Sequence, residues 1–451
     1  MKTMIVGGGG REHALAMAEY EAGSELYFPT PNAGMAQLGE HLWTPTGVYL
    51  DSALAEAAAK HGIDLAIIGP EAPLASGLAD RLREKGVSTL GFGAEAAQLE
   101  ASKVFSNEFM EQYGINRPAT VVANNLQDGM MFIKGRKPEN YVIKADGLAG
   151  GKGVILPHTE NQARDVLINM MSQNLFDGAG KRVLFQERLH GQEVSMMALF
   201  DGRNAEVLFL AQDFKRLKDK DKGPNTGGMG SYAPITEQVA EQWQIYQMYG
   251  TLEKTLDGLK DRGITDPGVI YIGFMLADEF NGEPAVMEYN VRFGDPETQA
   301  GLTLLQDAGV NVHELIAGAA NGDLGMEGEG HINTAALSGR AALTVCLATP
   351  GYPEAPRSGQ PIYGLGRDYE NAVVHHAATK YQPDEDGRIF TSGGRVLYVT
   401  GLGDSLQEAR QKAYEAIGDD GVSFDGMQVR SDIGKKAIKA IKKAAKETAT
   451  S

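Results

Sequence analysis

The sequence predicts a multidomain protein that combines α/β and α+β regions. Its 451 residues are enough for about three domains, each with a core of its own. Near the amino end, apolar segments at 4–6 and 65–68 are each followed by a helical pattern, at 11–20 and 73–85. Strand–turn–helix units of this kind build a parallel sheet. We therefore expect an α/β domain over residues 1–100.

A second region begins with a helical pattern at 98–113, which carries Lys103. Strand-like runs follow at 142–155 and 182–187, with no internal repeat. We assign this region to residues 101–334 and expect it to hold most of the chemistry.

A third, smaller region has an α/β pattern. Apolar runs at 341–348 and 395–399 predict strands, and the stretch 405–417 predicts a helix. We assign this region to residues 335–451. The basic segment 435–446 has little apolar face, so a solvated C-terminal helix is favoured over a membrane-surface helix.

Composition favours a soluble enzyme and excludes several classes of partner. The chain is 42% hydrophobic and 22% charged, and its net charge is −17. Binding to nucleic acid requires a basic surface, which this charge argues against. No membrane span or secretory leader is indicated, and Cys346, the single cysteine, lies in an apolar run. We therefore expect a cytoplasmic protein without disulfides.

One run, from Glu288 to Gln299, concentrates polar groups behind an apolar strand. The segment 285–287 predicts the end of a strand, so the two-residue period places Glu288, Asn290 and Arg292 on one face. Carboxylate and amide oxygens suit Mg²⁺ alongside nucleotide phosphates, and an arginine fork can clamp an anion. The alternative is a solvated strand edge. The glycine and proline that follow fix an irregular backbone beside the polar face, which favours a nucleotide–metal site.

Two glycine-rich segments precede that run. The segment 223–230 holds four glycines, which predict either an anion-binding nest of backbone N–H groups or a flexible surface loop. The segment 142–155 has two β-type halves around a turn with Lys144 and Lys152. It is not a Walker A motif, because Gly153 follows Lys152 and no hydroxyl is placed for magnesium. We expect it to form a mobile hairpin over phosphates.

The first glycine run, at residues 7–10, does not predict a dinucleotide site. Glu12 stands at the third position of the fingerprint, and no strand ending in an acid follows about 20 residues on. The helix start can nevertheless hold a phosphate beside Arg11 and His13, because its N–H groups and dipole favour anions. His13 by itself is more often a structural histidine.

The sequence resembles the phosphoribosylamine–glycine ligase family of the ATP-grasp superfamily. The resemblance rests on three segments that occur in the same order in that family, at 142–155, 223–230 and 288–299. The resemblance covers nearly the whole chain and includes further motifs at 5–15, 69–74, 211–216, 351–353, 392–397 and 432–434. It implies an ATP-grasp fold with an N-terminal parallel-sheet domain and a small C-terminal α/β domain.

The resemblance also implies an ATP site. In this superfamily a strand and hinge contact adenine mainly through backbone groups, and a later acid contacts the ribose, which points to Glu187, Leu189 and Glu193. Without the resemblance, Glu187 and Glu193 would be taken for surface acids. The implied ATP-binding residues are Lys103, Lys144, Gly150, Gly151, Lys152, Gly153, Glu187, Leu189 and Glu193.

The implied reaction joins glycine to 5-phosphoribosylamine in purine biosynthesis. ATP phosphorylates the glycine carboxylate, and the amine attacks the glycyl phosphate, giving glycinamide ribonucleotide, ADP and phosphate. Glu288 and Asn290 would hold Mg²⁺ or Mn²⁺. The implied catalytic residues are Arg292, Lys152 and Asp295. The implied substrate-binding residues are Gly9, Gly10, Arg11, Glu12, His13, Glu71, Asp213, Lys215, Thr226, Gly227, Gly228, Met229, Arg292 and Asp295.

Two departures from the family pattern leave alternatives open. Phe214 stands where the family usually has histidine, and the run 7–10 lacks the family's asparagine. One alternative is another ATP-grasp carboxylate–amine ligase with a different acid or amine. The other is a non-catalytic nucleotide-binding protein, although Glu288, Asn290 and Arg292 argue against it.

Overall fold

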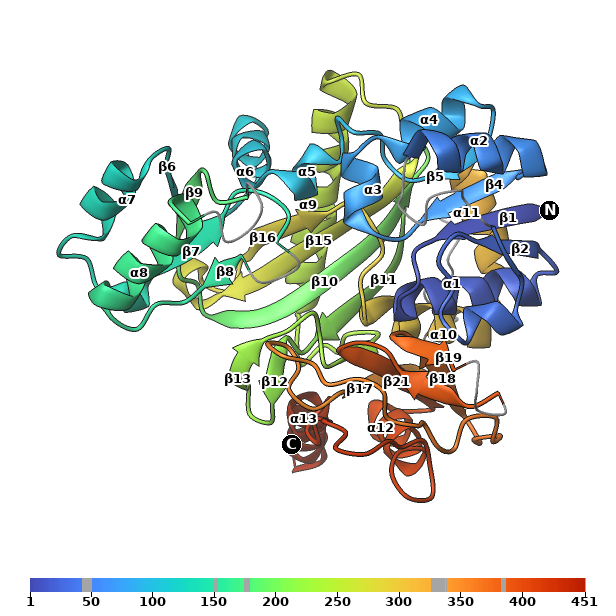
Figure 1. Cartoon of the computed structure of the whole chain (residues 1–451). Coiled ribbons are helices and arrows are strands. Elements are labelled where there is room, and N and C mark those ends of the chain that lie inside the picture. The colour runs from blue at the N-terminus through green and yellow to red at the C-terminus, as the bar shows by residue number, and fades with distance from the viewer. Residues whose placement is uncertain are drawn as a thin grey trace.

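Three regions surround a long central sheet in the computed structural model (Figure 1). The structure describes residues 1–42, 51–149, 153–173, 179–325, 337, 339–382 and 387–450. The N-terminal region, in blue, and a projecting teal region lie at opposite ends of the central sheet, with the red C-terminal region beneath it.

The N-terminal region contains the predicted parallel sheet. Within its described residues, five strands pair in the order β3-β2-β1-β4-β5, all parallel. The strands are β1 (Lys2–Val6), β2 (Glu25–Phe28), β3 (Glu40–His41), β4 (Leu65–Ile68) and β5 (Ser88–Leu90). The helices are α1 (Gly10–Glu21), α2 (Asp51–His61), α3 (Glu71–Ala75) and α4 (Leu78–Glu84), with a 3-10 turn η1 (Met35–Gln37).

Two helices that the sequence pattern predicts as continuous are each divided. The stretch 73–85 forms α3 and α4, because Gly77 adopts a φ of 85°, which ends one helix and starts the next. The stretch 98–113 forms α5 (Gln98–Ala101) and α6 (Lys103–Gln112). Ser102 is extended and its side chain accepts a hydrogen bond from the Phe105 N–H, so it caps a new helix.

The projecting region is a small sheet with two helices on it. Its described strands pair antiparallel in the order β6-β9-β7-β8. The elements are β6 (Thr120–Ala123), α7 (Leu126–Ile133), η2 (Pro138–Asn140), β7 (Tyr141–Ala145), β8 (Val154–Ile155), α8 (Glu160–Met171) and β9 (Val183–Glu187). The hairpin predicted at 142–155 is formed by β7 and β8, in which Lys144 pairs with Val154.

The central sheet continues into the C-terminal region without a break. Eight of the described strands pair antiparallel in the order β16-β15-β10-β11-β14-β17-β21-β18. The strands are β10 (Gly191–Phe200), β11 (Ala205–Asp213), β14 (Gly230–Ala233), β15 (Gly268–Ala277), β16 (Pro284–Asn290), β17 (Ala341–Ala348), β18 (Ala372–His376) and β21 (Arg395–Gly403). The junction is the pairing of β14 with β17.

Helices and two hairpins complete the fold. The helices are α9 (Gln242–Asp261), α10 (Glu297–Asp307), α11 (Val312–Ala320), α12 (Leu406–Glu415) and α13 (Lys435–Thr450), with a 3-10 turn η3 (Asp278–Phe280). The hairpins are β12 (Arg216–Lys218) with β13 (Lys222–Asn225), and β19 (Thr379–Tyr381) with β20 (Ile389–Thr391).

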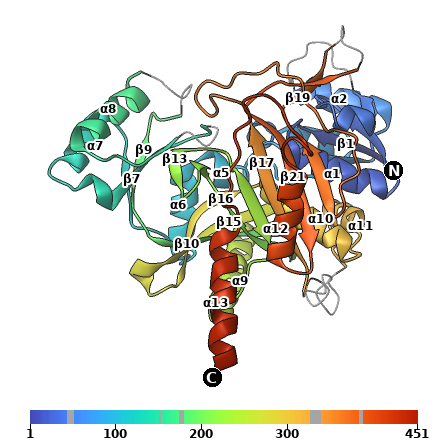
Figure 2. The same ribbon diagram turned by 90° about the horizontal axis from the view of Figure 1, so that it is seen from below.

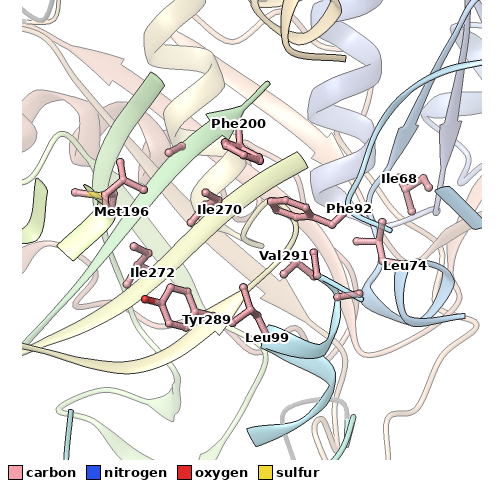
Figure 3. Close-up of a cluster of buried hydrophobic side chains, with 14 of the residues drawn as sticks. Ile68, Leu74, Phe92, Leu99, Met196, Phe200, Ile270, Ile272, Tyr289 and Val291 are labelled. Carbon is pink, nitrogen blue, oxygen red and sulfur yellow. The ribbon is translucent and has the colours of Figure 1, made fainter. Parts of the chain in front are cut away.

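The hydrophobic cores cross the domain boundaries expected from the sequence. Figure 3 shows Phe92 of the N-terminal region against Phe200 and Ile270 of the central sheet, and the Phe92 and Phe200 rings stack at 5.8 Å. The same cluster reaches Leu343 of the C-terminal region. The expectation of a separate core for each domain is therefore wrong for these regions. The projecting region differs, because α7, α8 and its sheet bury a cluster of their own.

The C-terminal helix is less solvated than the sequence predicts. It extends away from the body (Figure 2), yet Ala437 is buried and Ile438 and Ile441 pack against the main core. Its lysines point outward, so a narrow apolar face is enough to anchor the helix. Of the described helices, none is long and apolar enough to cross a membrane.

Candidate functional site

A cluster of opposite charges lies where the central sheet meets the projecting region. The Lys215 ammonium lies 3.4 Å from a carboxylate oxygen of Glu288 on β16 and 3.4 Å from one of Glu193 on β10. All three side chains are partly exposed. The structure thus brings together one metal, one ATP-site and one substrate-site residue predicted from different segments of the sequence.

Strand β16 presents its polar groups on one face, with a bulge that the sequence did not reveal. Glu288 pairs with Gly273 and Asn290 with Tyr271, in regular register, so their side chains share a face. The register shifts between Gly273 and Phe274, which leaves Met287 as the extra residue. Without such a bulge, strict alternation would place Val286 on the face of Glu288, but it packs in the main core.

Arg292 lies beyond the end of β16, not within the strand as predicted. Its guanidinium donates to the amide oxygen of Asn290 at 3.1 Å and pairs with Glu100 at 2.8 Å and Glu71 at 3.3 Å. Arg292 therefore joins the strand to the N-terminal region. Of its two acidic partners, the sequence indicated Glu71 and not Glu100.

The cluster holds more acid than its lysine neutralises. The Lys215 ammonium, more than any other group, holds the pKa of Glu288 down to about 2. Burial raises the pKa of Asp213 to about 8, although Lys215 opposes the shift. Three further acids add to that increase, Glu297, Glu193 and Glu288. An additional cation would relieve this repulsion.

Two more predicted lysines lie near Glu288. Lys144 is buried on β7, where its ammonium donates to the carbonyl of Met287 at 3.1 Å, and burial lowers its pKa to about 8. The expectation of a lid lysine without local partners is therefore wrong for Lys144. Lys103, in the first turn of α6, donates to the carbonyl of Gly147 at 3.3 Å. Both ammonium groups contribute to the low pKa of Glu288.

The turn of the β7–β8 hairpin is only partly described. Gly150, Gly151 and Lys152 lie outside the described residues. Gly153 follows them, and its carbonyl accepts a hydrogen bond from the Ala145 N–H at 2.8 Å.

The predicted adenine segment connects the small sheet to the central one. Glu187 ends β9, and its N–H donates to the carbonyl of Ala119. Leu189 is buried with Met275 and Ala285 of the central sheet. Glu193 follows on β10, next to Lys215, so the three predicted residues lie along one continuous segment.

The first glycine turn is closed by Glu12. A carboxylate oxygen of Glu12 accepts the Gly9 N–H at 2.7 Å, and the other pairs with Arg11 at 2.6 Å. Arg11 is buried and also donates to the carbonyl of Phe293. His13 Nδ1 accepts the backbone N–H of His376. Arg11 and His13 thus contact protein groups, and their place beside a phosphate stays a prediction.

Most of the remaining predicted residues lie in the second glycine loop, and Gly10 begins α1. The Thr226 hydroxyl donates to the Lys215 carbonyl at 2.8 Å and accepts the Gly228 N–H at 3.0 Å. Met229 is fully buried, and Gly10 lies so close to Tyr398 that an added Cβ would come within 2.3 Å of its ring.

Sequence reasoning missed residues whose partners lie far along the chain. Arg395 donates to the carbonyl of Asp295 at 2.8 Å, and Tyr352 accepts the Gly227 N–H at 3.1 Å. Both residues lie in motifs that carried the family resemblance, at 392–397 and 351–353. Nothing in the local pattern indicates these contacts.

The donor set fits a magnesium or manganese ion shared with nucleotide phosphates. Glu288 and Asn290 offer two oxygens, and the Asn290 oxygen keeps a lone pair beyond its bond to Arg292. Among the described residues, no cluster of three or more His, Cys, Asp or Glu side chains is arranged as a metal site. The positive charges of three lysines near Glu288, Lys215, Lys144 and Lys103, complement the negative charge of a phosphate chain. The fold and this arrangement define an ATP-grasp ligase.

Known proteins match the chain along its length. The phosphoribosylglycinamide synthetase family descriptions match as an N domain at 1–100, an ATP-grasp (A) domain at 101–298 and a C domain at 342–436. The phosphoribosylamine–glycine ligase of Ralstonia nicotianae is 37% identical over 442 residues, which is 97% of this chain and 100% of that protein. The chain belongs to the phosphoribosylamine–glycine ligase family.

Solved structures agree with this assignment. The phosphoribosylamine–glycine ligase of Thermotoga maritima superposes with a TM-score of 0.79 at 33% identity, over 96% of this chain and 100% of that one. The biotin carboxylase domain of a Hydrogenobacter thermophilus carboxylase superposes with a TM-score of 0.69 at 16% identity, over 95% of this chain and 91% of that one. The second likeness shows the shared fold only.

Proposed function

We propose that this chain joins glycine to 5-phosphoribosylamine, using ATP and forming glycyl phosphate on the way to glycinamide ribonucleotide. The observation that carries the proposal is the surroundings of Glu288. A carboxylate with a pKa of about 2 lies among Lys215, Lys144 and Lys103, where β16 ends. Family membership over nearly the full length supports the choice of substrates.

In this proposal, phosphoryl transfer depends on positioning and charge. Glu288 and Asn290 would hold Mg²⁺ or Mn²⁺, which would neutralise charge on the phosphates when bound. The buried ammonium of Lys144 meets phosphate oxygens from the side of β7. Arg292, held by Glu71 and Glu100, faces the same strand end and stabilises charge on the group being transferred. Lys152 keeps the role the sequence predicts for it, outside the described residues.

The acids near Lys215 receive the amino group of glycine. Asp213 carries a pKa of about 8 because it is buried among other acids, so a nearby ammonium would stabilise its charged form. Asp295, in the segment between β16 and α10, is the second candidate. The glycyl phosphate must be kept from water until the amine attacks, and we assign that task to the β7–β8 hairpin.

We further propose the domain limits 1–100, 101–334 and 335–451, and a cytoplasmic location. Small molecules are the partners that family membership supports.

A different ATP-grasp ligase activity has two departures in its favour, the glycine run 7–10 without asparagine and the phenylalanine at position 214. The Arg430 guanidinium lies over the Phe214 ring at 5.1 Å, and Tyr232 lies 6.3 Å from it. These contacts give Phe214 a packing role that requires no change of substrate.

The direct test measures ADP formation with each substrate omitted in turn. We expect release of ADP only when glycine and 5-phosphoribosylamine are both present, because the site retains glycyl phosphate until the amine arrives. Full turnover with another amino acid and none with glycine would show that the chain has a different ligase activity. ATP binding without turnover under any combination would indicate a non-catalytic nucleotide-binding protein.

A further inference from the structure

One arginine of the C-terminal region reaches the predicted glycine site. Arg395, at the start of β21, donates from Nη1 to the Gly227 carbonyl at 2.6 Å and to the Asp295 carbonyl at 2.8 Å. Its Nη2 lies 3.5 Å from a carboxylate oxygen of Asp295. A single guanidinium therefore connects the glycine-rich loop, the segment after β16 and the C-terminal region.

The glycine-rich loop fits closely around this contact. An added Cβ at Gly227 would lie 2.8 Å from Cζ of Arg395. At Gly228, where φ is 118°, an added Cβ would lie 2.4 Å from Pro296. A planar guanidinium with donors in fixed directions suits this arrangement, whereas a lysine ammonium offers no fork.

Asp295 depends on Arg395 for its charge and its orientation. Burial by itself would raise the pKa of Asp295, but the positive charges of Arg395 and then Arg11 reverse that effect and lower it. Gln299 fixes the other carboxylate oxygen by donating to it at 2.9 Å. The carboxylate is therefore ionised and held on both sides.

We propose that Arg395 is a positioning residue for glycine, which fixes the Asp295 carboxylate and the turn at Gly227 and Gly228 so that they receive the glycine ammonium. The inference rests on the proposed function and deepens it. The donors of Arg395 described above go to protein acceptors, so it acts through Asp295 and not on the substrate. The C-terminal region thereby contributes to a site built mainly on the central sheet.

A double-mutant cycle on ADP formation tests this inference. We expect Arg395→Met to raise the KM for glycine at least tenfold while the KM for ATP stays within about twofold. Arg395→Lys keeps the charge without the fork, so its KM for glycine should be intermediate. Combining Arg395→Met with Asp295→Asn should be little worse than the more severe single change, because the two residues act as one unit.

Arg340→Met is the matched control. Arg340 pairs with the partly exposed Asp307 and the exposed Asp404, away from the glycine loop, so its removal should leave all three KM values unchanged. Wild-type turnover with glycine tests the proposed function separately from the role of Arg395.

Two results would overturn the inference. Additive losses in the double variant would show that Arg395 acts independently of Asp295. A raised KM for 5-phosphoribosylamine with an unchanged KM for glycine would show that Arg395 binds the phosphate directly. If Arg395→Met does not fold, an unchanged KM for glycine in Arg395→Lys also rejects the inference.

Discussion

Two ionic clusters in this molecule use similar residues but differ in how completely those residues are bonded. The Arg430 side chain is 1% exposed and donates to Asp432 at 2.8 Å, to Asp221 at 2.9 Å and to the Arg216 carbonyl at 3.0 Å. The Lys215 side chain is 38% exposed and shares its charge between Glu193 and Glu288 at 3.4 Å each. The first cluster is saturated with partners, and the second is not.

This difference in bonding distinguishes a structural ionic network from a ligand-binding site. A buried charge remains stable only when its partners and hydrogen bonds are complete, as they are around Arg430, which fastens the β12–β13 hairpin to the C-terminal region. Around Lys215 the contacts are long, and burial together with the neighbouring acids raises the pKa of Asp213 to about 8. Incomplete bonding beside a strand end marks where a ligand binds. Three predictions test this comparison.

The largest expected effect is on stability, at the saturated cluster. Arg430→Met should lower the free energy of unfolding by about 3 kcal/mol, because it leaves Asp432 and Asp221 without their shared cation. The kcat of the folded fraction should stay within about twofold. Urea unfolding of this variant beside Arg340→Met, whose ion pairs are more exposed, provides the measurement and its control. A loss of kcat without a loss of stability would place Arg430 in the site instead.

A smaller effect concerns the pH dependence of ATP binding. Burial lowers the pKa of Lys144 from 10.5 to about 8, so its ammonium is charged below that pH and neutral above it. ATP affinity should therefore fall by up to about tenfold per pH unit between about 8 and 10. The same shift makes stability rise with pH in that window, since the unfolded chain binds more protons there.

Calorimetric titration with ATP between pH 7 and 9.5 measures this dependence. In Lys144→Met the affinity should be lower and nearly independent of pH. If ATP affinity depended on pH in the same way in wild type and variant, Lys144 would not be part of the phosphate site.

The smallest effect is expected in the projecting region, which buries its own hydrophobic cluster. We expect Mg-ATP to slow amide exchange in β8 by about tenfold, because that strand pairs with β7 at only two positions. Exchange in β15, paired along its whole length, should not change. Equal effects in both strands would mean that the hairpin does not close separately over the nucleotide.

Local patterns in the sequence predicted much of this fold. The strand–turn–helix units at the amino end and the strand at 341–348 follow from buried apolar runs, whose signal lies within a few residues. The common face of Glu288 and Asn290 follows from the two-residue period. Helix division at Ser102 was missed, because one capping hydrogen bond outweighs a continuous helical pattern.

Long-range contacts could not be predicted from local sequence patterns. Glu100 and Arg292, or Arg395 and Gly227, meet only after the sheets have assembled, and no spacing in the chain indicates the pairing. The same holds for the contact between Arg11 and the Phe293 carbonyl. The shared cores also depend on tertiary packing, since an apolar residue does not specify which sheet it will pack against.

The central claim, that Glu288 holds the metal for phosphoryl transfer, is tested by the magnesium dependence of kcat. We expect Glu288→Gln to lower kcat about a hundredfold, or about 3 kcal/mol, and to raise the magnesium requirement, with Asn290→Ala changed in the same direction. Glu370→Gln, at an exposed pair with Lys412, is the control and should match wild type. The kcat of each variant is compared for the folded fraction, so that a loss of stability is not mistaken for a loss of catalysis. Superimposable magnesium curves for wild type and Glu288→Gln would contradict the account.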